Sequence, residues 1–364
     1  MSETLRVGVV GAGIGAGYIA GFQKQSNVEV VALCARTRAR MEPLAERYHI
    51  LHLYTDYDEM LAREPMDIVV VATPNYLHHA MTLAALNANK HVICDKPLAM
   101  NVAQAQEMLD CANARGRKHF MPFVFRFLPA AQYMKEIIDV GFLGQVFHVN
   151  VRYYVHGWGD MFGPMRWQYD REQAGTGTLG NIGSHMIHLI HWWLGDIRRV
   201  SAMMSTAVRE RKWHDGTVVP IYVDDVCAFI GELDNGAPIV FNTSSVSLVA
   251  RARVEIDIFG SEGALTFQQD WGKEYSLTGN IIALRRNDQV PSPVEIPARL
   301  KGEFTDMPDY YTPMRTNFVR MTSEFVGAIR EDRPAAPNFH DGVRVQHVMD
   351  AVCKSVETQS WVEV

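Results

Sequence analysis

The segment from His91 to Leu98 reads His-Val-Ile-Cys-Asp-Lys-Pro-Leu, a short apolar run that ends in a carboxylate, an ammonium group and a proline. A charge directly after a buried strand lies at the carboxyl edge of a parallel sheet, where such sheets bind ligands. Pro97 cannot continue the strand and restricts Lys96 to an extended backbone. An ammonium group held in this way can stabilise a developing alkoxide, so Lys96 is the first catalytic candidate.

A single lysine after a strand is usually a surface residue, but two other motifs are expected to end at the same edge. Thr73-Pro74-Asn75 follows the apolar run from Asp67 to Ala72, and a glycine-rich turn, Gly11 to Gly17, follows the run from Leu5 to Val10. The turn opens a helix, and a strand, a tight turn and a helix in this order form the context of a dinucleotide-binding fingerprint.

Each small residue of this turn has an expected task. Gly11 permits the tight turn, Gly13 lets the backbone approach a pyrophosphate, and Ala16 takes the third small position, where the helix packs on the strand. The amino end of the helix adds free N–H groups and a partial positive charge for the phosphates.

The residues after the expected second strand, Val28 to Cys34, bear on the choice between NAD and NADP. A carboxylate there would bind the ribose 2′-hydroxyl of NAD, but the sequence continues Ala35-Arg36-Thr37-Arg38. Arg36 could contact the 2′-phosphate of NADP, or it could only stack on the adenine of NAD. Both cofactors stay open, with a slight preference for NADP.

A second group of chemically capable residues lies between Gly175 and Gly195, where glycines lead into a helix that we expect to be amphipathic. Asn181, His185 and His188 should share one face of it. His191 would lie roughly 240° around the helix from His185, so the histidines cannot form one metal site, and we expect no metal. His185, close to Gly183, is the catalytic candidate, whereas His188 and His191 are interpreted as structural.

Aromatic and polar residues also gather just before this helix: Tyr153, Tyr154, His156, Trp158, Arg166, Trp167 and Tyr169. Aromatic rings rimmed by polar groups suit a carbohydrate or polyol, whose C–H faces stack while its hydroxyls form hydrogen bonds. Each of these residues alone could equally belong to a packed core. Together they favour a sugar-like substrate.

Composition limits the other possibilities. The chain has 364 residues, 48% of them hydrophobic, and a formal net charge of −6. This length allows two domains, and the absence of a basic run interleaved with aromatics argues against nucleic acid. The apolar runs are only as long as strands, no export signal is visible, and the five cysteines are scattered, so we expect a cytoplasmic protein that does not interact with membranes.

The pattern of elements changes near residue 126. Strands alternate with helices through residue 124, which predicts a doubly wound parallel sheet in a first domain, residues 1–125. Long alternating segments with turns at Asp234-Asn235-Gly236 and Gly260 to Gly263 predict an open, mainly antiparallel sheet in a second domain, residues 126–364. We expect one face of that sheet to support the active site and the other to form a subunit interface. The closing helices could pack back on the first domain.

These residues resemble the glucose-fructose oxidoreductase and inositol dehydrogenase family (Gfo/Idh/MocA) along essentially the whole chain. The matching segments are Gly11–Gly13, Ala72–His78, His91–Pro97, Phe125–Phe127, Gly177–His185 and Asp341–Val345. The resemblance implies a Rossmann domain, an open antiparallel sheet, a bound nicotinamide cofactor and oxidation or reduction of a sugar or cyclitol hydroxyl. It also implies that Lys96 lies beside the nicotinamide and the reacting oxygen, and that His185 is the acid/base. Asn181 is expected one helical turn from His185 on the same face, where its amide can orient the imidazole ring, so it is a third catalytic candidate.

Two sets of residues are expected to make contacts, one with the cofactor and one with the substrate. The cofactor set is Gly11, Gly13, Ile14, Arg36, Thr73, Pro74, Asn75, His78, Asp95, Lys96 and Pro97. The substrate set is Lys96, Arg126, His156, Trp167, Asn181 and His185.

The chain departs from the family pattern at three positions: Asp95 replaces the usual glutamate, and Asn181 and His188 replace the usual aspartates. The leading hypothesis is an NAD(P)-dependent sugar or polyol dehydrogenase or reductase that forms a homo-oligomer. A redox-neutral, NAD-dependent enzyme that cleaves glycosides and a non-catalytic cofactor-sensing regulator are the alternatives.

Overall fold

The structure is a computed structural model that describes residues 4–156, 162–249, 252–270, 278–301 and 312–364. The chain divides into two compact units. The first comprises Met1–Val124 and Pro308–Gln346, and the second comprises Phe125–Met307 and His347–Val364. No helix in the described ranges is long and apolar enough to cross a membrane.

The first unit contains a six-stranded parallel sheet in the order β3-β2-β1-β4-β5-β6. Its strands are β1 (Leu5–Val10), β2 (Val28–Cys34), β3 (His52–Tyr54), β4 (Ile68–Val71), β5 (His91–Cys94) and β6 (His119–Phe120). The chain runs outward from β1 to β3 and then returns to β4, so the direction of winding reverses between β1 and β4. Such a switch point is where open parallel sheets bind ligands. The predicted doubly wound sheet is confirmed.

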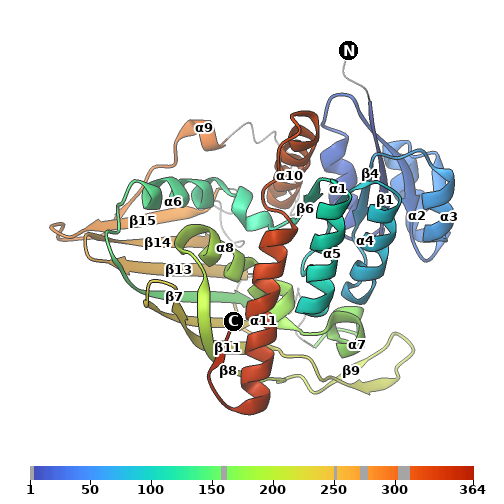
Figure 1. Ribbon diagram of the computed structural model, residues 1–364. Coiled ribbons are helices and arrows are strands. Elements are labelled where there is room, and N and C mark those ends of the chain that lie inside the picture. The colour runs from blue at the N-terminus through green and yellow to red at the C-terminus, as the bar shows by residue number, and fades with distance from the viewer. Residues whose placement is uncertain (1–3, 157–161, 250–251, 271–277, 302–311) are drawn as a thin grey trace. The chain divides into compact units, whose positions relative to one another are not determined.

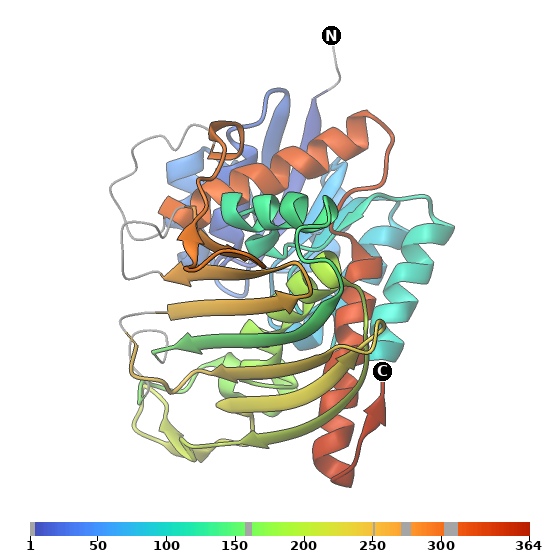
Figure 2. The same cartoon turned by 90° about the vertical axis from the view of Figure 1, so that its left-hand side faces the viewer.

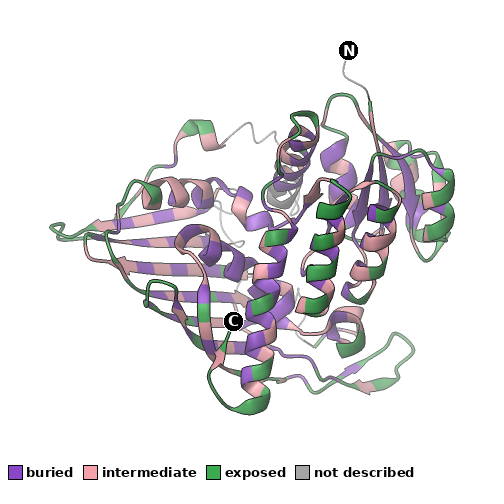
Figure 3. Ribbon diagram, in the orientation of Figure 1, coloured by how far each residue is buried: buried purple, intermediate pink, exposed green. Residues whose placement is uncertain are grey.

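Burial explains why the central strands were easy to predict. β4 is buried along its whole length (Figure 3), as expected for a parallel strand covered on both faces. β3 was not predicted, because it has only three residues and none of them is fully buried. β6 ends at Phe120, since the Met121 N–H leaves the sheet to bond Pro337 O (3.0 Å) and Pro122 has no N–H.

Helices accompany the strands of the first unit: α1 (Gly15–Phe22), α2 (Arg38–Tyr48), α3 (Tyr57–Arg63), α4 (His78–Asn87), α5 (Val102–Ala114) and α10 (Thr312–Arg330). α4 lies beside α5, and α1 beside α10 (Figure 1). The side chain of Asn101 caps α5, accepting from the Gln104 N–H (3.0 Å). A further helix, α11 (Phe339–Thr358), has residues in both units.

Small residues on α1 allow α10 to approach closely. A Cβ atom at Gly17 would lie 2.6 Å from Phe318 Cε2, and one at Gly21 would lie 2.8 Å from Phe318 O. The Tyr18 ring meets the Phe318 ring edge-on at 4.8 Å between centroids. α10, far along the chain, is therefore part of the core of the first unit.

The second unit contains a nine-stranded sheet in the order β16-β15-β14-β13-β7-β12-β11-β8-β17 (Figure 2). Its strands are β7 (Val146–Val155), β8 (Ile197–Ser205), β11 (Val226–Leu233), β12 (Pro238–Ser244), β13 (Ala252–Gly260), β14 (Gly263–Asp270), β15 (Asn280–Arg285), β16 (Ser292–Pro293) and β17 (Val362–Glu363). A separate ribbon pairs β9 (Glu210–Lys212) with β10 (Val218–Pro220). The pairs are antiparallel except β7 with β12. The predicted mainly antiparallel sheet, with hairpins at residues 234–236 and 260–263, is confirmed.

The two faces of this sheet differ. Along β13, Val254, Ile256 and Ile258 are fully buried, whereas Glu255 and Asp257 face the other way and bond Arg152. The buried face packs against helices, because α6 (Pro129–Asp139) contacts β14, β15 and α8 (Ser184–Leu194).

The expected amphipathic pattern of α8 is wrong. Every residue from Ser184 to His191 is buried, and the Trp193 indole N–H bonds Ala131 O of α6 (3.1 Å). α8 thus lies inside the second unit rather than on its surface. The second unit also contains two short helices, α7 (Arg171–Ala174) and α9 (Ala298–Lys301).

Candidate active site

The glycine-rich turn of the first unit has the geometry that a dinucleotide requires. Gly11 has a φ of +108°, and a Cβ there would lie 2.0 Å from Ala72 O. A Cβ at Gly13 would meet no atom within 4 Å, so the backbone at Gly13 faces open space that a pyrophosphate could occupy. Ile14, next to it, is exposed. The residues of this turn therefore fit a dinucleotide cofactor.

One detail of the turn differs from the expectation. α1 lies close to the sheet at Gly15, where a Cβ would be 3.0 Å from Val9 Cγ1, whereas Ala16 is partly exposed. Spacing alone marked Ala16 as the packing position. The sequence carries glycines at 11, 13, 15 and 17, so spacing could not tell which of them meets the strand.

Arg36 lies next to this turn. The Gly11 N–H bonds Cys34 O (2.8 Å), which joins the glycine turn to the end of β2. Arg36 is exposed two residues further on, and its neighbour Arg38 pairs with Glu42 (3.4 Å). The position of Arg36 is compatible with either expected role.

His78 connects the segments that follow β4 and β5. Its ring is fully buried, with Nδ1 2.9 Å from Pro97 O and Nε2 3.0 Å from Thr73 O. Burial lowers the pKa of His78. The Asp95 carboxylate and the two carbonyl groups favour the protonated ring and so oppose this shift, but burial is the larger effect. His78 therefore holds the backbone of two predicted cofactor-binding segments, and Pro74 and the buried Asn75 lie in one of them.

Asp95 and Lys96 lie where β5 ends. Asp95 Oδ1 accepts from the Lys96 N–H (2.8 Å) and from the Tyr18 hydroxyl (3.5 Å). Burial raises the pKa of Tyr18 well above its usual value, so the hydroxyl stays a donor. Lys96 is partly buried, and burial lowers the pKa of its ammonium group while the Asp95 carboxylate raises it. Burial is the larger of the two effects, so the pKa of Lys96 is lowered overall.

In the second unit, the glycine-rich segment enters α8 through a π-helical turn, Leu179–Gly183, in which the Ser184 N–H bonds Leu179 O. We expected Asn181 and His185 to share a face of one regular α-helix, and that periodicity does not hold across the π turn. A π turn contains an extra residue, and such turns are frequent at functional sites. His185 and His188, both within α8, keep regular α-helical spacing.

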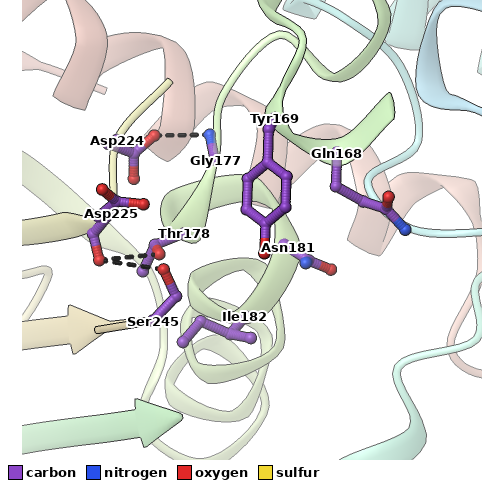
Figure 4. Close-up of a pocket in the computed structure, with 9 residues that line it drawn as sticks. All are labelled: Gln168, Tyr169, Gly177, Thr178, Asn181, Ile182, Asp224, Asp225 and Ser245. Carbon is purple, nitrogen blue, oxygen red and sulfur yellow. Dashed lines mark hydrogen bonds between the residues drawn. The ribbon is translucent and has the colours of Figure 1, made fainter. Parts of the chain in front are cut away.

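Asn181 lines a small hollow of about 10 Å³, room for about one water molecule. Figure 4 shows its lining residues: Gln168, Tyr169, Gly177, Thr178, Asn181, Ile182, Asp224, Asp225 and Ser245. Sequence reasoning did not select Gln168, Asp224, Asp225 or Ser245. The sequence does contain a signal for two of them: Asp224 and Asp225 are adjacent carboxylates just before the apolar strand β11. A charge that is buried at such a position needs compensating groups, so the pair could have been selected as a candidate.

The Tyr169 ring, which lines the hollow, also contacts residues that do not line it. The Arg211 guanidinium of β9 lies 3.6 Å from the centre of the Tyr169 ring, and its Nη1 bonds Gly163 O (2.8 Å). Met165, Ile221 and Val223 bury the ring further.

His185 is buried among aromatic rings. Its ring lies 5.2 Å from that of Phe125, and Phe125 lies 5.5 Å from Tyr153. Phe125 belongs to one of the family-like segments noted above. Its neighbour Arg126 places its guanidinium 4.6 Å from the centre of the Trp192 ring.

The predicted aromatic cluster does not form one surface. Tyr153 is buried, whereas the adjacent Tyr154 points to the opposite face of β7, because neighbouring side chains alternate along a strand. Trp167 opens a short 3₁₀ helix, Trp167–Tyr169, and His156 forms an isolated bridge with Val246. Trp158 lies outside the described residues. In the described part of the chain, no three His, Cys, Asp or Glu side chains are grouped as metal ligands.

Two family models match most of the chain. A model described as "Oxidoreductase family, NAD-binding Rossmann fold" matches residues 5–123, and its companion, "Oxidoreductase family, C-terminal alpha/beta domain", matches residues 135–364. An uncharacterised oxidoreductase of Synechocystis sp. is 29% identical over 100% of this chain and 97% of its own length. Levoglucosan dehydrogenase of Pseudarthrobacter phenanthrenivorans is 27% identical over 88% of this chain and 85% of its own length.

A solved structure agrees with the fold. Levoglucosan dehydrogenase in complex with NADH and L-sorbose superposes with a TM-score of 0.89 at 24% identity, covering 99% of this chain and 98% of that one. At this level of identity the likeness concerns the fold alone.

Gly11 and Gly13 allow a matched test. Gly11→Ala should destabilise the protein by more than about 1 kcal/mol, because alanine is strained at positive φ and its Cβ meets Ala72 O. Gly13→Ala should change the free energy of unfolding by less than about 0.5 kcal/mol but weaken NADH binding, because its methyl group enters the open space. Urea unfolding and NADH fluorescence titration measure the two effects. Unchanged NADH affinity in Gly13→Ala would contradict the placement of the pyrophosphate.

Proposed function

Since the chain belongs to the Gfo/Idh/MocA family of oxidoreductases, we propose that it transfers a hydride between a nicotinamide dinucleotide and a secondary hydroxyl or ketone of a sugar or cyclitol. The observation that carries this proposal is the partly buried Lys96, whose pKa is lowered by burial at the end of β5. It lies in the same unit as a glycine turn that fits a dinucleotide. The levoglucosan dehydrogenase relative supports a sugar-like substrate.

Bound nicotinamide would supply the hydride acceptor or donor, and the chain's own residues would manage the proton and the developing charge. Lys96 is the group that stabilises the alkoxide oxygen as it forms. Asp95 orients it through the backbone N–H of Lys96 (2.8 Å) and keeps its pKa from falling further. Thr73, Pro74, Asn75 and Pro97 contribute to cofactor binding through the segments that His78 holds.

His185 is the proposed acid/base. Asn181, a polar residue four positions earlier in the sequence, is the third residue proposed for catalysis. Imidazole exchanges a proton near neutral pH, as this reaction requires. The Phe125 ring at 5.2 Å limits the freedom of the His185 ring. Arg126, His156 and Trp167 complete the proposed substrate-binding set.

We also propose that the protein is a homo-oligomer formed through the polar face of the large sheet. That face carries three exposed apolar side chains: Ile230 (49% exposed), Val240 (50%) and Met203 (69%). Ile230 pairs with Val240 on the neighbouring strand β12, and Met203 lies on the neighbouring strand β8. Sedimentation velocity should give a dimer or tetramer, and Ile230→Lys should lower the mass. A monomeric wild-type protein at micromolar concentration would contradict this proposal.

Arg36 is proposed to bind a 2′-phosphate, which would make NADP the preferred cofactor. Arg36→Ala should then weaken NADP binding by about 1.5–3 kcal/mol, the value of a charge-assisted hydrogen bond, while NAD binding changes little. Titration of both cofactors measures the difference. Arg47→Ala, near the far end of α2, removes the same charge and serves as the control. Equal losses for NAD and NADP in Arg36→Ala would assign Arg36 to adenine stacking.

Lys96 provides the test of the function itself. Lys96→Met should keep cofactor binding but lower kcat by about a hundredfold or more, because the alkoxide loses its charged partner. Turnover is followed by absorbance at 340 nm with a panel of aldoses, anhydrosugars and inositols, and a redox-neutral reaction would give product without net absorbance change. Lys90→Met, at the other end of β5, is the matched control. Wild-type turnover in Lys96→Met would refute the assignment.

A further inference from the structure

The segment just before the π turn is held by hydrogen bonds from the residues that precede β11. The Asp224 carboxylate accepts from two backbone N–H groups, those of Gly177 (Oδ1, 2.6 Å) and Leu179 (Oδ2, 2.8 Å). Between them, the Thr178 N–H bonds Asp224 O (2.8 Å) and the Thr178 hydroxyl bonds Asp225 O (3.0 Å). Four hydrogen bonds therefore hold three consecutive residues, as Figure 4 shows in part.

Asp224 is only 7% exposed, so these bonds lie largely away from solvent. Burial raises the pKa of Asp224, while the N–H groups of Leu179 and Gly177 lower it, and the neighbouring Asp225 raises it further. Removing an acceptor from such a buried arrangement leaves N–H groups without partners, which is more costly than losing an exposed bond.

Close packing makes the attachment rigid. A Cβ at Gly177 would lie 2.1 Å from Asp224 O, so only glycine allows the two backbones to approach this closely. Asn181 lies four residues after Gly177, and its N–H bonds Gly177 O (3.0 Å). The position of Asn181 therefore depends on the segment that Asp224 holds.

The adjacent Asp225 differs in what its side chain does. Its carboxylate accepts from the Val208 N–H (2.8 Å), away from the glycine segment, and only its backbone carbonyl reaches Thr178. Two neighbouring carboxylates thus serve two different segments.

We propose that Asp224 is a positioning residue that fixes the entry to the π turn, and with it Asn181 and the start of the helix that carries His185. The catalytic part of this inference rests on the proposed function, whereas the structural part does not. Two measurements separate them.

The first measurement is hydrogen exchange of the peptide covering residues 176–183, followed by mass spectrometry. Asp224→Asn offers one acceptor oxygen and an NH₂ group, so it cannot serve both N–H groups, and exchange there should rise by about tenfold or more. In Asp225→Asn the rise should fall on the segment around Val208 instead. Unchanged exchange at 176–183 in Asp224→Asn would overturn the inference.

The second measurement is kinetic. Asp224→Asn should lower kcat about tenfold or more and increase the deuterium isotope effect on kcat with a C-deuterated sugar, without changing the NADH dissociation constant. A merely structural role would lower the fraction of active enzyme and leave the isotope effect unchanged. Thr206→Val, which removes the bond from Thr206 Oγ1 to Val223 O (2.8 Å), is the control for a lost hydrogen bond nearby.

The outcomes are distinguishable. Faster exchange with reduced kcat and a larger isotope effect supports the inference, and faster exchange with an unchanged isotope effect overturns the positioning role. Full activity of His185→Ala would refute the proposed acid/base, whatever Asp224→Asn shows. If Asp224→Asn does not fold, Thr178→Val, which removes one bond from the same segment, replaces it and should show a smaller rise in exchange with a smaller loss of kcat.

Discussion

A charge that is removed from water needs hydrogen bonds or an opposite charge, and this constraint governs both candidate regions of the protein. In the first unit, Lys96 is partly buried and has the Asp95 carboxylate beside it. In the second, the buried Asp224 carboxylate accepts from two backbone N–H groups. In each case the compensating groups also fix the backbone, so the same contacts that make the charge tolerable position the residues proposed for chemistry.

Backbone partners explain why parts of the site could not be predicted. The apolar runs gave β1 and β2 with their observed bounds, because continuous burial leaves a pattern in the sequence. Lys96 was found because it follows such a run. Asp224 was missed, since backbone N–H groups, which every residue but proline possesses, are its partners and leave no pattern of their own.

Local geometry accounts for the remaining differences. The π turn at Leu179–Gly183 contains one residue more than an α-helical turn and so changes the period of the helix. The residue types in this segment do not indicate the extra residue. The aromatic residues near 153 were counted as one cluster, but strand alternation sends Tyr153 and Tyr154 to opposite faces. The close contact between α1 and Val9 of β1 lies at Gly15, which spacing could not single out because the turn contains several glycines. Spacing identifies the element in each case, whereas packing decides the direction of each side chain.

The same electrostatic constraint bears on Asn181, where the related family usually has an aspartate. Asn181 lines a hollow that already contains Asp224 and Asp225, and burial raises the pKa of both carboxyl groups. A third carboxylate in this hollow would be repelled by the other two and would lose its own hydration. A neutral amide keeps hydrogen-bonding capacity at that position without adding charge. The replacement is therefore consistent with the surroundings that this chain provides, and it leaves His185 as the ionisable member of the pair proposed for proton transfer.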